Sequence, residues 1–299
     1  MHNSIVPYVL LILCVNASSL FAQEKRNEWE DIRRQAVLRY TGSTWAGLNE
    51  SGTDRGRVRS DQSDFSYQER FPLAEAWKLI LGAGYKRTNL GLGAGAPLPG
   101  LLQGVNARVG GEWRFDPRWT GAVLLSPGVY GDANLGDGDF KMPASVSAHF
   151  TQRPGLHWIG GLAFGGFGRR AVTPFFGVIW RIDPRWNLRL VPPLARVEYR
   201  VIETARGPTD LFLGAGFDGS RHRVSSDLGT RVGRPELNGD QLSVQQAEAR
   251  TGVSASWDFI QGELSAGWQF LRRYKYENSG VTLKAGNAAL ISAGLSARF

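Results

Sequence analysis

The chain has 299 residues, a formal net charge of +8 and a hydrophobic content of 42%. Its longest apolar run covers residues 5–15, shorter than the roughly 20 residues of a transmembrane helix, which excludes a helical membrane protein. No basic run is longer than two residues, so the arginines favour a lumen or loop surface over a nucleic-acid interface. A soluble β-protein or a β-barrel remains, and the alternating strands of a barrel give a soluble-looking average hydropathy.

The N-terminal segment 1–22 has the features of a secretory signal peptide. Residues 5–15 form its apolar core, and Ala22 is a suitable small residue before a cleavage site. No Lys or Arg precedes the core, and Ala17–Ser19 offers a second possible cleavage site. The only cysteine, Cys14, follows a large residue, which disfavours a lipoprotein signal. Segment 1–22 is therefore predicted to direct the chain through the inner membrane of a Gram-negative bacterium.

The charged segment 23–35 predicts a periplasmic tail, and 36–299 predicts an outer-membrane β-barrel. From residue 36 on, strand-like segments alternate with turns rich in Gly, Pro and Asp. The candidate strands are 36–44, 62–71, 75–86, 103–115, 119–127, 143–151, 156–168, 173–182, 186–191, 194–202, 209–220, 243–257, 261–273 and 287–299. The fold class is thus all-β, a transmembrane antiparallel up-and-down barrel of about 14 strands. Twelve is the alternative, because 186–191 and 194–202 are short for membrane strands.

Alternation between apolar and polar side chains is clearest in segment 105–115. Its odd positions, from Val105 to Phe115, are apolar or glycine, while most even positions between them are polar. Segments 145–151 and 247–257 have the same period of two, which gives a strand one apolar and one polar face. The apolar face meets the core in a soluble sandwich and lipid in a membrane barrel. The signal-like start and the aromatic strand ends favour the barrel.

One turn sequence occurs twice. WRFDPRW at 113–119 recurs as WRIDPRW at 180–186, and Trp257 lies in a degenerate third copy. Asp-Pro suits the first two positions of a type I turn, and flanking tryptophans suit the edge of a membrane. We expect an interface girdle at Trp113, Trp119, Trp180, Trp186 and Trp257, on the periplasmic side. Longer external loops are then expected at 45–61, 87–102, 128–142, 221–242 and 274–286.

The last strand candidate, 287–299, alternates up to a terminal Phe299. Such an ending resembles the C-terminal targeting strand of Gram-negative outer-membrane barrels, which the barrel-assembly machinery reads. Phe299 is therefore the candidate targeting residue. The expected partners are outer-membrane lipid, the barrel-assembly machinery during insertion and a small solute, and no nucleic acid.

The hairpin segment 183–200, DPRWNLRLVPPLARVEYR, resembles a domain-of-unknown-function family of bacterial outer-membrane β-barrel proteins. Members of that family carry a similar D-P-x-W run, then Pro, then E-Y-R at the corresponding hairpin. The resemblance extends by strand rhythm over 35–299. It implies the barrel and the outer membrane, and it implies no activity.

Charged side chains on the polar strand faces are the candidates for a lumen constriction. They belong inside, because a lipid-facing Arg or Lys at the membrane midplane costs about 2–4 kcal/mol. These side chains either brace neighbouring strands across the lumen or form a constriction that selects solutes by charge. The candidates are Arg108, Glu112, Arg114, Arg196, Glu198, Arg200, Glu248 and Arg250.

Catalytic, metal and cofactor motifs are weak, and no enzyme, metal site or cofactor is predicted. Ser147 and His149 share a strand face, but a lumen histidine among hydroxyls explains them equally well. The Gly-rich stretches 91–100 and 160–168 lack the spacing of a phosphate loop. Asp132, Asp137 and Asp139 are expected in a solvated loop rather than around Ca²⁺.

Two functions therefore remain open. The first is porin-like, passive or gated passage of a small solute through a polar lumen. The second is a structural or surface-interaction barrel with a filled lumen and no transport.

Overall fold

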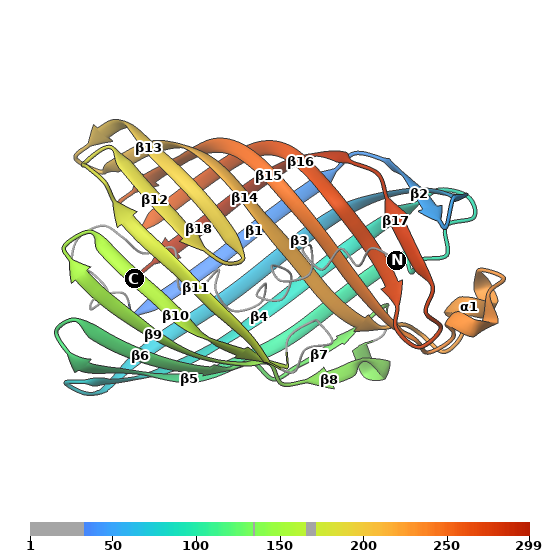
Figure 1. The fold of residues 1–299 in the computed structure, drawn as a ribbon, viewed down its shortest axis with the longest axis horizontal. Helices are drawn as coiled ribbons and strands as arrows, with labels where there is room; N and C mark the ends of the chain where they lie inside the picture. Colours follow the sequence, from blue (N-terminus) through green and yellow to red (C-terminus); the bar gives the residue numbers. More distant parts are fainter. Residues whose placement is uncertain (1–32, 134, 166–171) are drawn as a thin grey trace, which may run out of the picture.

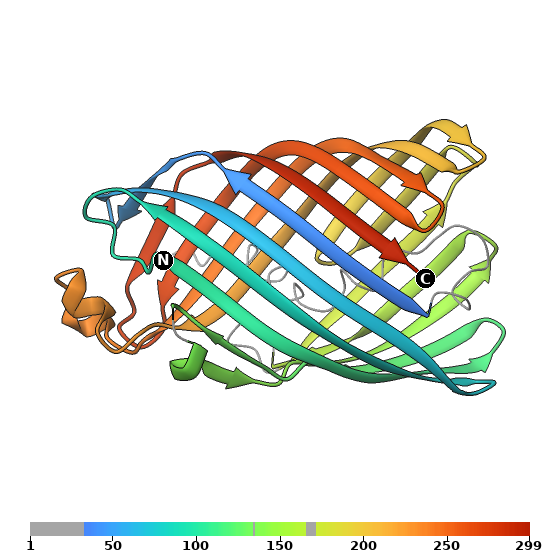
Figure 2. The ribbon, with the colours of Figure 1, turned by 180° about the vertical axis from the view of Figure 1, so that it is seen from behind.

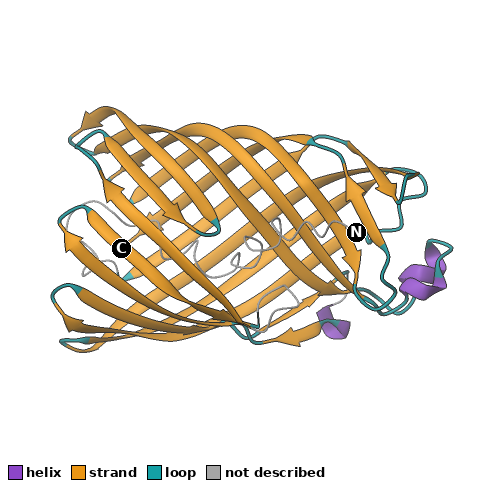
Figure 3. Cartoon of the chain, in the orientation of Figure 1, coloured by secondary structure: helices purple, strands orange, loops and turns teal. Residues whose placement is uncertain are grey.

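The computed structural model describes residues 33–133, 135–165 and 172–299. Over these residues the chain forms one closed antiparallel barrel of fourteen strands (Figures 1 and 3). The prediction of fourteen strands is confirmed, and the alternative of twelve is wrong. The predicted signal peptide and most of the predicted tail lie outside the described residues, and β1 begins at Arg34.

Eighteen strand segments make up the fourteen strands, because four strands are interrupted. The first nine segments are β1 (Arg34–Ser43), β2 (Ala46–Glu50), β3 (Thr53–Ala74), β4 (Trp77–Leu92), β5 (Leu101–Asp116), β6 (Trp119–Leu125), β7 (Gly128–Gly131), β8 (Asp139–Lys141) and β9 (Ala144–Arg153). The others are β10 (Leu156–Phe164), β11 (Val172–Arg181), β12 (Trp186–Val191), β13 (Leu194–Thr204), β14 (Gly207–Arg223), β15 (Gln241–Trp257), β16 (Ile260–Tyr276), β17 (Thr282–Ala285) and β18 (Ala288–Arg298). The interrupted strands are β1/β2, β6/β7, β8/β9 and β17/β18. In each of them the two parts pair with the same neighbouring strand of the barrel.

The first and last strands close the barrel. β1 pairs with β18 from Gln35–Arg298 to Ser43–Leu290, and on its other side it pairs with β3. Figure 2 shows β1 lying between these two strands. The backbone N–H of Phe299 donates to the carbonyl of Arg34, which fixes the end of the chain to its first strand. The predicted C-terminal strand is therefore the one that seals the barrel.

All three tryptophan-flanked turns lie at the end of the barrel that also holds Phe299, which we call the turn end. Asp116 Oδ1 accepts hydrogen bonds from the backbone N–H groups of Arg118 and Trp119, at 2.6 and 3.0 Å. Asp183 Oδ1 makes the same two bonds to Arg185 and Trp186. The repeated sequence therefore builds the same aspartate-capped turn twice.

An apolar belt surrounds the outside of the barrel. Its side chains alternate along each strand with residues that point inward, as a pleated strand requires. Belt members on well separated strands include Leu38, Phe65, Leu213, Leu264 and Ile291, all of them exposed. Aromatic pairs border the belt at the turn end, including Trp77–Trp113, Trp119–Phe150, Trp186–Tyr199 and Phe259–Phe299.

The barrel narrows toward its other end, which we call the loop end. The pairing of β14 with β13 stops at Gly216, and β14 continues to Arg223, which pairs with Gly131 of β7. His222 Nδ1 lies 3.1 Å from the carbonyl oxygen of Gln103 on β5. The wall at the loop end thus consists of nine strand segments: β14, β15, β16, β17, β2, β3, β4, β5 and β7. Eight strands give an interior just wide enough for side chains to fill, and this end of the barrel is only slightly larger.

Apolar side chains change sides where the barrel narrows. On β3, Phe65 points outward, whereas Val58, seven residues earlier, is fully buried inside. On β4 the same change occurs between the outward Tyr85 and the inward Leu90. Strand pairing therefore continues through much of what the sequence predicts as external loops, and the loop bounds 45–61, 87–102, 128–142 and 274–286 are wrong in extent. The predicted loop 221–242 contains the end of β14 and the short helix α1 (Leu228–Arg231).

Candidate functional site: the charged lumen and its cap

The barrel encloses a cavity with a volume of about 990 Å³. It begins beside the turns at the turn end, where Asp183, Arg206 and Asp258 line it, and reaches the ion pair of Lys86 and Asp218. Ligand pockets in proteins have volumes of roughly 300–1,000 Å³, so the lumen is large enough for a small solute. The lumen is therefore not filled by side chains at the turn end.

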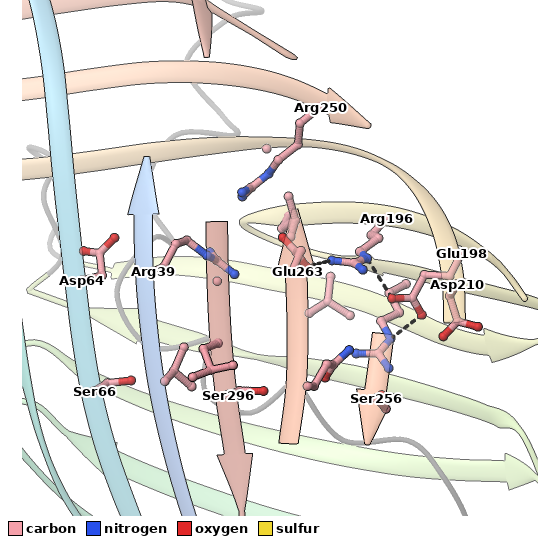
Figure 4. A pocket seen from close by; sticks show the side chains of 18 of the residues that line it. Arg39, Asp64, Ser66, Arg196, Glu198, Asp210, Arg250, Ser256, Glu263 and Ser296 are labelled. Carbon is pink, nitrogen blue, oxygen red and sulfur yellow. Dashed lines mark hydrogen bonds and ion pairs between the residues drawn. The ribbon is translucent and has the colours of Figure 1, made fainter. Parts of the chain in front are cut away.

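Arg196 lies at the centre of the charged network that lines this cavity. Its Nη1 is 2.5 Å from Glu263 on β16, and its Nε is 2.8 Å from Glu198 on the same strand (Figure 4). The guanidinium also lies over the ring of Phe212, 3.6 Å from the centroid. One arginine thus joins strands that are far apart in sequence, and each carboxylate offsets the cost of burying its charge.

Further pairs extend the network in both directions along the wall. Arg200 Nε is 3.2 Å from Asp210, and Arg250 Nη2 is 2.6 Å from Glu248. Arg39 and Asp64 extend the lining beyond β18, on β1 and β3 (Figure 4). The cavity is therefore lined by both signs of charge.

The predicted constriction residues divide into two groups. Six of them line the cavity: Arg108, Arg196, Glu198, Arg200, Glu248 and Arg250. Glu112 is outside the cavity lining and lies 3.8 Å from the buried Arg70 of β3, while Arg114 is exposed at the turn end. Their role in selecting solutes stays a prediction. Sequence reasoning missed Glu263, although the same alternation places it on the polar face of β16 with Gln261 and Ser265.

An apolar core closes the lumen at the loop end, and we call it the cap. It consists of inward side chains of the wall at the loop end together with residues from the segments 93–100 and 224–240: Leu48, Val58, Leu90, Ala96, Leu98, Leu102, Val224, Leu228, Leu237, Leu242, Tyr274, Tyr276 and Leu283. Each is at most 7% exposed, so water is excluded between them. The charged cavity ends below this core.

Buried polar contacts hold the two cap segments in place. The hydroxyl of Tyr276 donates to the carbonyl oxygen of Pro97 at 2.7 Å. Asp240, 2% exposed, accepts hydrogen bonds from the backbone N–H groups of Asn278 and Ser279 at 2.9 Å. A Cβ at Gly229 would lie 2.1 Å from the carbonyl oxygen of Arg234, so only glycine fits the packing there.

An ion pair joins the cap to the rim of the barrel. Arg234 Nη1 is 2.8 Å from Glu50, which also binds Arg55 at the tip of the β2–β3 hairpin. Burial works to raise the pKa of the Glu50 carboxyl, but the bonds and charges of Arg234 and Arg55 outweigh it and lower the pKa below its ordinary value. The pair therefore holds the cap most firmly when Glu50 is ionised.

The residues of the weak catalytic and metal hypotheses lie as follows in the structure. Ser147 Oγ lies 3.4 Å from His149 Nε2, at the limit of a hydrogen bond. Asp132 accepts from the backbone N–H of Ser225, and Asp139 pairs with Arg223. Within the described ranges, no group of three His, Cys, Asp or Glu side chains is arranged to hold a metal. No helix in that part of the chain is long and apolar enough to cross a membrane.

Comparison with known proteins gives structural likeness only. No family model and no curated protein matches the chain, so the resemblance of segment 183–200 to a family of unknown function stays a prediction. The fold is similar to that of the COG4313 outer membrane channel from Pseudomonas putida F1, at 12% identity and a TM-score of 0.44, covering 93% of this chain and 100% of that one. It is also similar to the Pseudomonas putida toluene transporter TodX, at 9% identity and a TM-score of 0.47 (97% and 95% covered), and to the translocator domain of NalP from Neisseria meningitidis, at 11% identity and a TM-score of 0.40 (94% and 91% covered).

Proposed function

We propose that this protein is an outer-membrane barrel of a Gram-negative bacterium that passes a small solute through its charged lumen, and that the cap gates this passage. The turn end faces the periplasm and the loop end faces the outside, since barrels keep their periplasmic connections short. The proposal rests on the geometry of the chain itself.

The apolar belt supports the membrane location. Exposed side chains such as Leu264 and Ile291, 67% and 70% exposed, would each be unfavourable in water. In a closed barrel every backbone group can pair with a neighbouring strand, which is what a bilayer demands. Aromatic side chains at the turn end, including Trp119 and Trp257, suit the boundary between lipid and headgroups.

A single observation carries the proposal of passage: a charged cavity of about 990 Å³ that begins at the periplasmic turns and stops at an apolar cap. A polar lumen lets a solute enter, and an apolar constriction without water opposes its exit. The resting barrel is therefore closed to the outside, and passage requires the cap to move. The capped end also favours the second candidate, a surface-interaction barrel without transport.

Single-channel conductance in a planar bilayer tests the proposal. The refolded protein is expected to be nearly silent, and a variant with residues 226–239 replaced by a short Gly-Ser linker is expected to give discrete steps that scale with salt. A matched control replaces the exposed cap pair Asp227 and Arg231 by alanine and is expected to stay silent, since such pairs contribute little. Silence of the linker variant, once insertion is verified, would contradict passage and favour the surface-interaction barrel.

A further inference from the structure

Arg108 differs in its surroundings from Arg196 and Arg250, which line the same cavity. Arg196 and Arg250 each have a carboxylate within 3 Å, and Arg70 has Glu112 at 3.8 Å. Arg108 is 9% exposed and lines the cavity, yet no carboxylate among the described residues lies within ion-pair distance of it. Its Nε and Nη1 are buried, and no described residue accepts a hydrogen bond from either atom.

A buried guanidinium without an anion is costly, because the protein interior does not replace the lost hydration. Buried polar groups in native proteins have partners, and an exception calls for a physical reason such as an ion held at the site. The charge of Arg108 is therefore left for a partner that the described residues do not supply.

The surroundings of Arg108 form a niche at the inner edge of the cavity, below the cap. Gly84 and Gly104 line it, and the Asn106 amide and the Tyr130 ring pack against them where side chains would otherwise lie. Asn106 and Tyr130 lie on the same side and are joined by a hydrogen bond from Asn106 Nδ2 to the Tyr130 hydroxyl at 3.4 Å. The ring of Tyr130 gives the niche one apolar wall.

The charge balance of the niche limits the charge of the anion. Lys86, the neighbouring cation, is already neutralised by Asp218, whose two oxygens accept hydrogen bonds from Lys86 Nζ at 2.8 and 3.0 Å. Within the described part of the chain, the positive charge of Arg108 remains uncompensated. A singly charged ligand balances it, and a guanidinium matches the geometry of a carboxylate.

We propose that Arg108, with Asn106 and Tyr130, binds the carboxylate of a small organic acid that enters the lumen. This inference deepens the proposed function, because it assigns a solute class to the same lumen. The niche is then a solute-binding site directly below the closed cap.

Titration calorimetry on the detergent-solubilised, refolded protein tests the site without any transport. Sodium propionate at low ionic strength is expected to bind the wild-type protein saturably at one site. Arg108→Gln is expected to weaken this binding at least tenfold. Arg185→Gln removes the same charge from an exposed arginine at the opposite end of the cavity and is expected to change the affinity less than twofold. Equal affinity of Arg108→Gln and wild type, or the lack of saturable binding by wild type, would overturn the proposal.

A stability measurement separates a ligand site from a structural role. Arg108→Met removes a buried charge and leaves no carboxylate unpaired, so it is expected to raise the denaturant midpoint of unfolding when no anion is added. Propionate is expected to raise the midpoint of the wild type and not that of Arg108→Met. A lower midpoint for Arg108→Met without anion, or the same propionate effect on both proteins, would contradict the site.

Inorganic phosphate is the second probe. Saturable binding of phosphate at Arg108 in place of propionate would overturn the assignment to carboxylates. The proposed site and the proposed passage can be contradicted separately. Propionate binding by an electrically silent linker variant would support the carboxylate site and contradict passage. Conductance without propionate binding would keep passage and reject the site.

Discussion

At the turn end, fourteen strands surround an open cavity lined by arginines and carboxylates, whereas at the loop end nine of these strands close around leucines and tyrosines. The wider end keeps its inward charges in pairs, such as Arg196 with Glu263, and has room for solvent. The narrower end has a side-chain core like that of a small soluble barrel. Barrel circumference therefore decides whether the same alternating strands enclose a lumen or a core, and the following variants test the two ends separately.

The largest effect is expected at the turn end, from Arg196→Met. The change leaves Glu198 and Glu263 buried without their main partner, which costs about 3–5 kcal/mol. Heat modifiability on gels is expected to show unfolding at a lower temperature. In the linker variant that lacks the cap, reversal potentials are expected to shift toward cation preference. Arg185→Met, at the exposed mouth, is the matched control, and equal effects of the two changes would contradict the central role of Arg196.

The second effect is expected at the loop end, from Leu237→Ala. Leu237 is fully buried in the cap, and truncation of a buried leucine costs about 2–5 kcal/mol. Limited proteolysis is expected to cut segment 224–240 faster while the barrel itself stays folded. Leu73→Ala, at an exposed position of the turn end, is expected to leave the cleavage rate unchanged. Loss of the whole barrel in Leu237→Ala would show that the two ends unfold together.

A smaller effect is expected from Tyr276→Phe, which removes the buried hydrogen bond to the carbonyl of Pro97. Loss of one such bond, with its acceptor left unsatisfied, costs about 1–3 kcal/mol. Hydrogen exchange is expected to speed up in residues 93–100 and to stay unchanged at the turn end. Tyr85→Phe removes an exposed bond to Gln103 and serves as the control. Similar exchange in both variants would mean that the cap does not depend on this bond.

The smallest effect is expected from acid and from Glu50→Gln. The pKa of Glu50 is lowered in the folded protein, so its stabilisation is complete above its unfolded pKa of about 4.3 and is lost as pH falls through the folded value. Proteolysis of the cap with an acid-active protease is expected to accelerate below about pH 4 in the wild type, by an amount equivalent to roughly 1 kcal/mol or less. Glu50→Gln is expected to lose this pH dependence, whereas Glu236→Gln, more exposed on the same arginine, is expected to keep it.

Much of the fold could be predicted from the sequence, because lipid-facing strands follow a simple period of two. The strand number, the turns capped by Asp116 and Asp183 and the closing strand ending at Phe299 all follow from local patterns. The cap was missed because the apolar side chains move from the outer to the inner face within one strand, as between Phe65 and Val58. A search for apolar residues on the outer face alone then predicts a loop where the strand continues. This reversal is visible in the sequence and could have predicted an internal core.

The candidate site was less predictable than the fold. Inward charges such as Arg196, Glu198 and Arg200 follow from alternation alone. Which of them pair depends on neighbours brought together by closure, as with Arg196 and Glu263, and the sequence does not specify those distances. For the same reason, the sequence does not show that Arg108 lacks a carboxylate partner among the described residues.

The two copies of the aspartate-capped turn also bear on how such a barrel can change in evolution. The turns at Asp116 and Asp183 lie at the same end and are separated by four strands, namely β6/β7, β8/β9, β10 and β11. Gain or loss of a single strand between them would carry the second turn, with its flanking tryptophans, to the opposite side of the membrane. Only whole hairpins can therefore be inserted or deleted here, and a repeated turn of this kind is the natural unit for such a duplication.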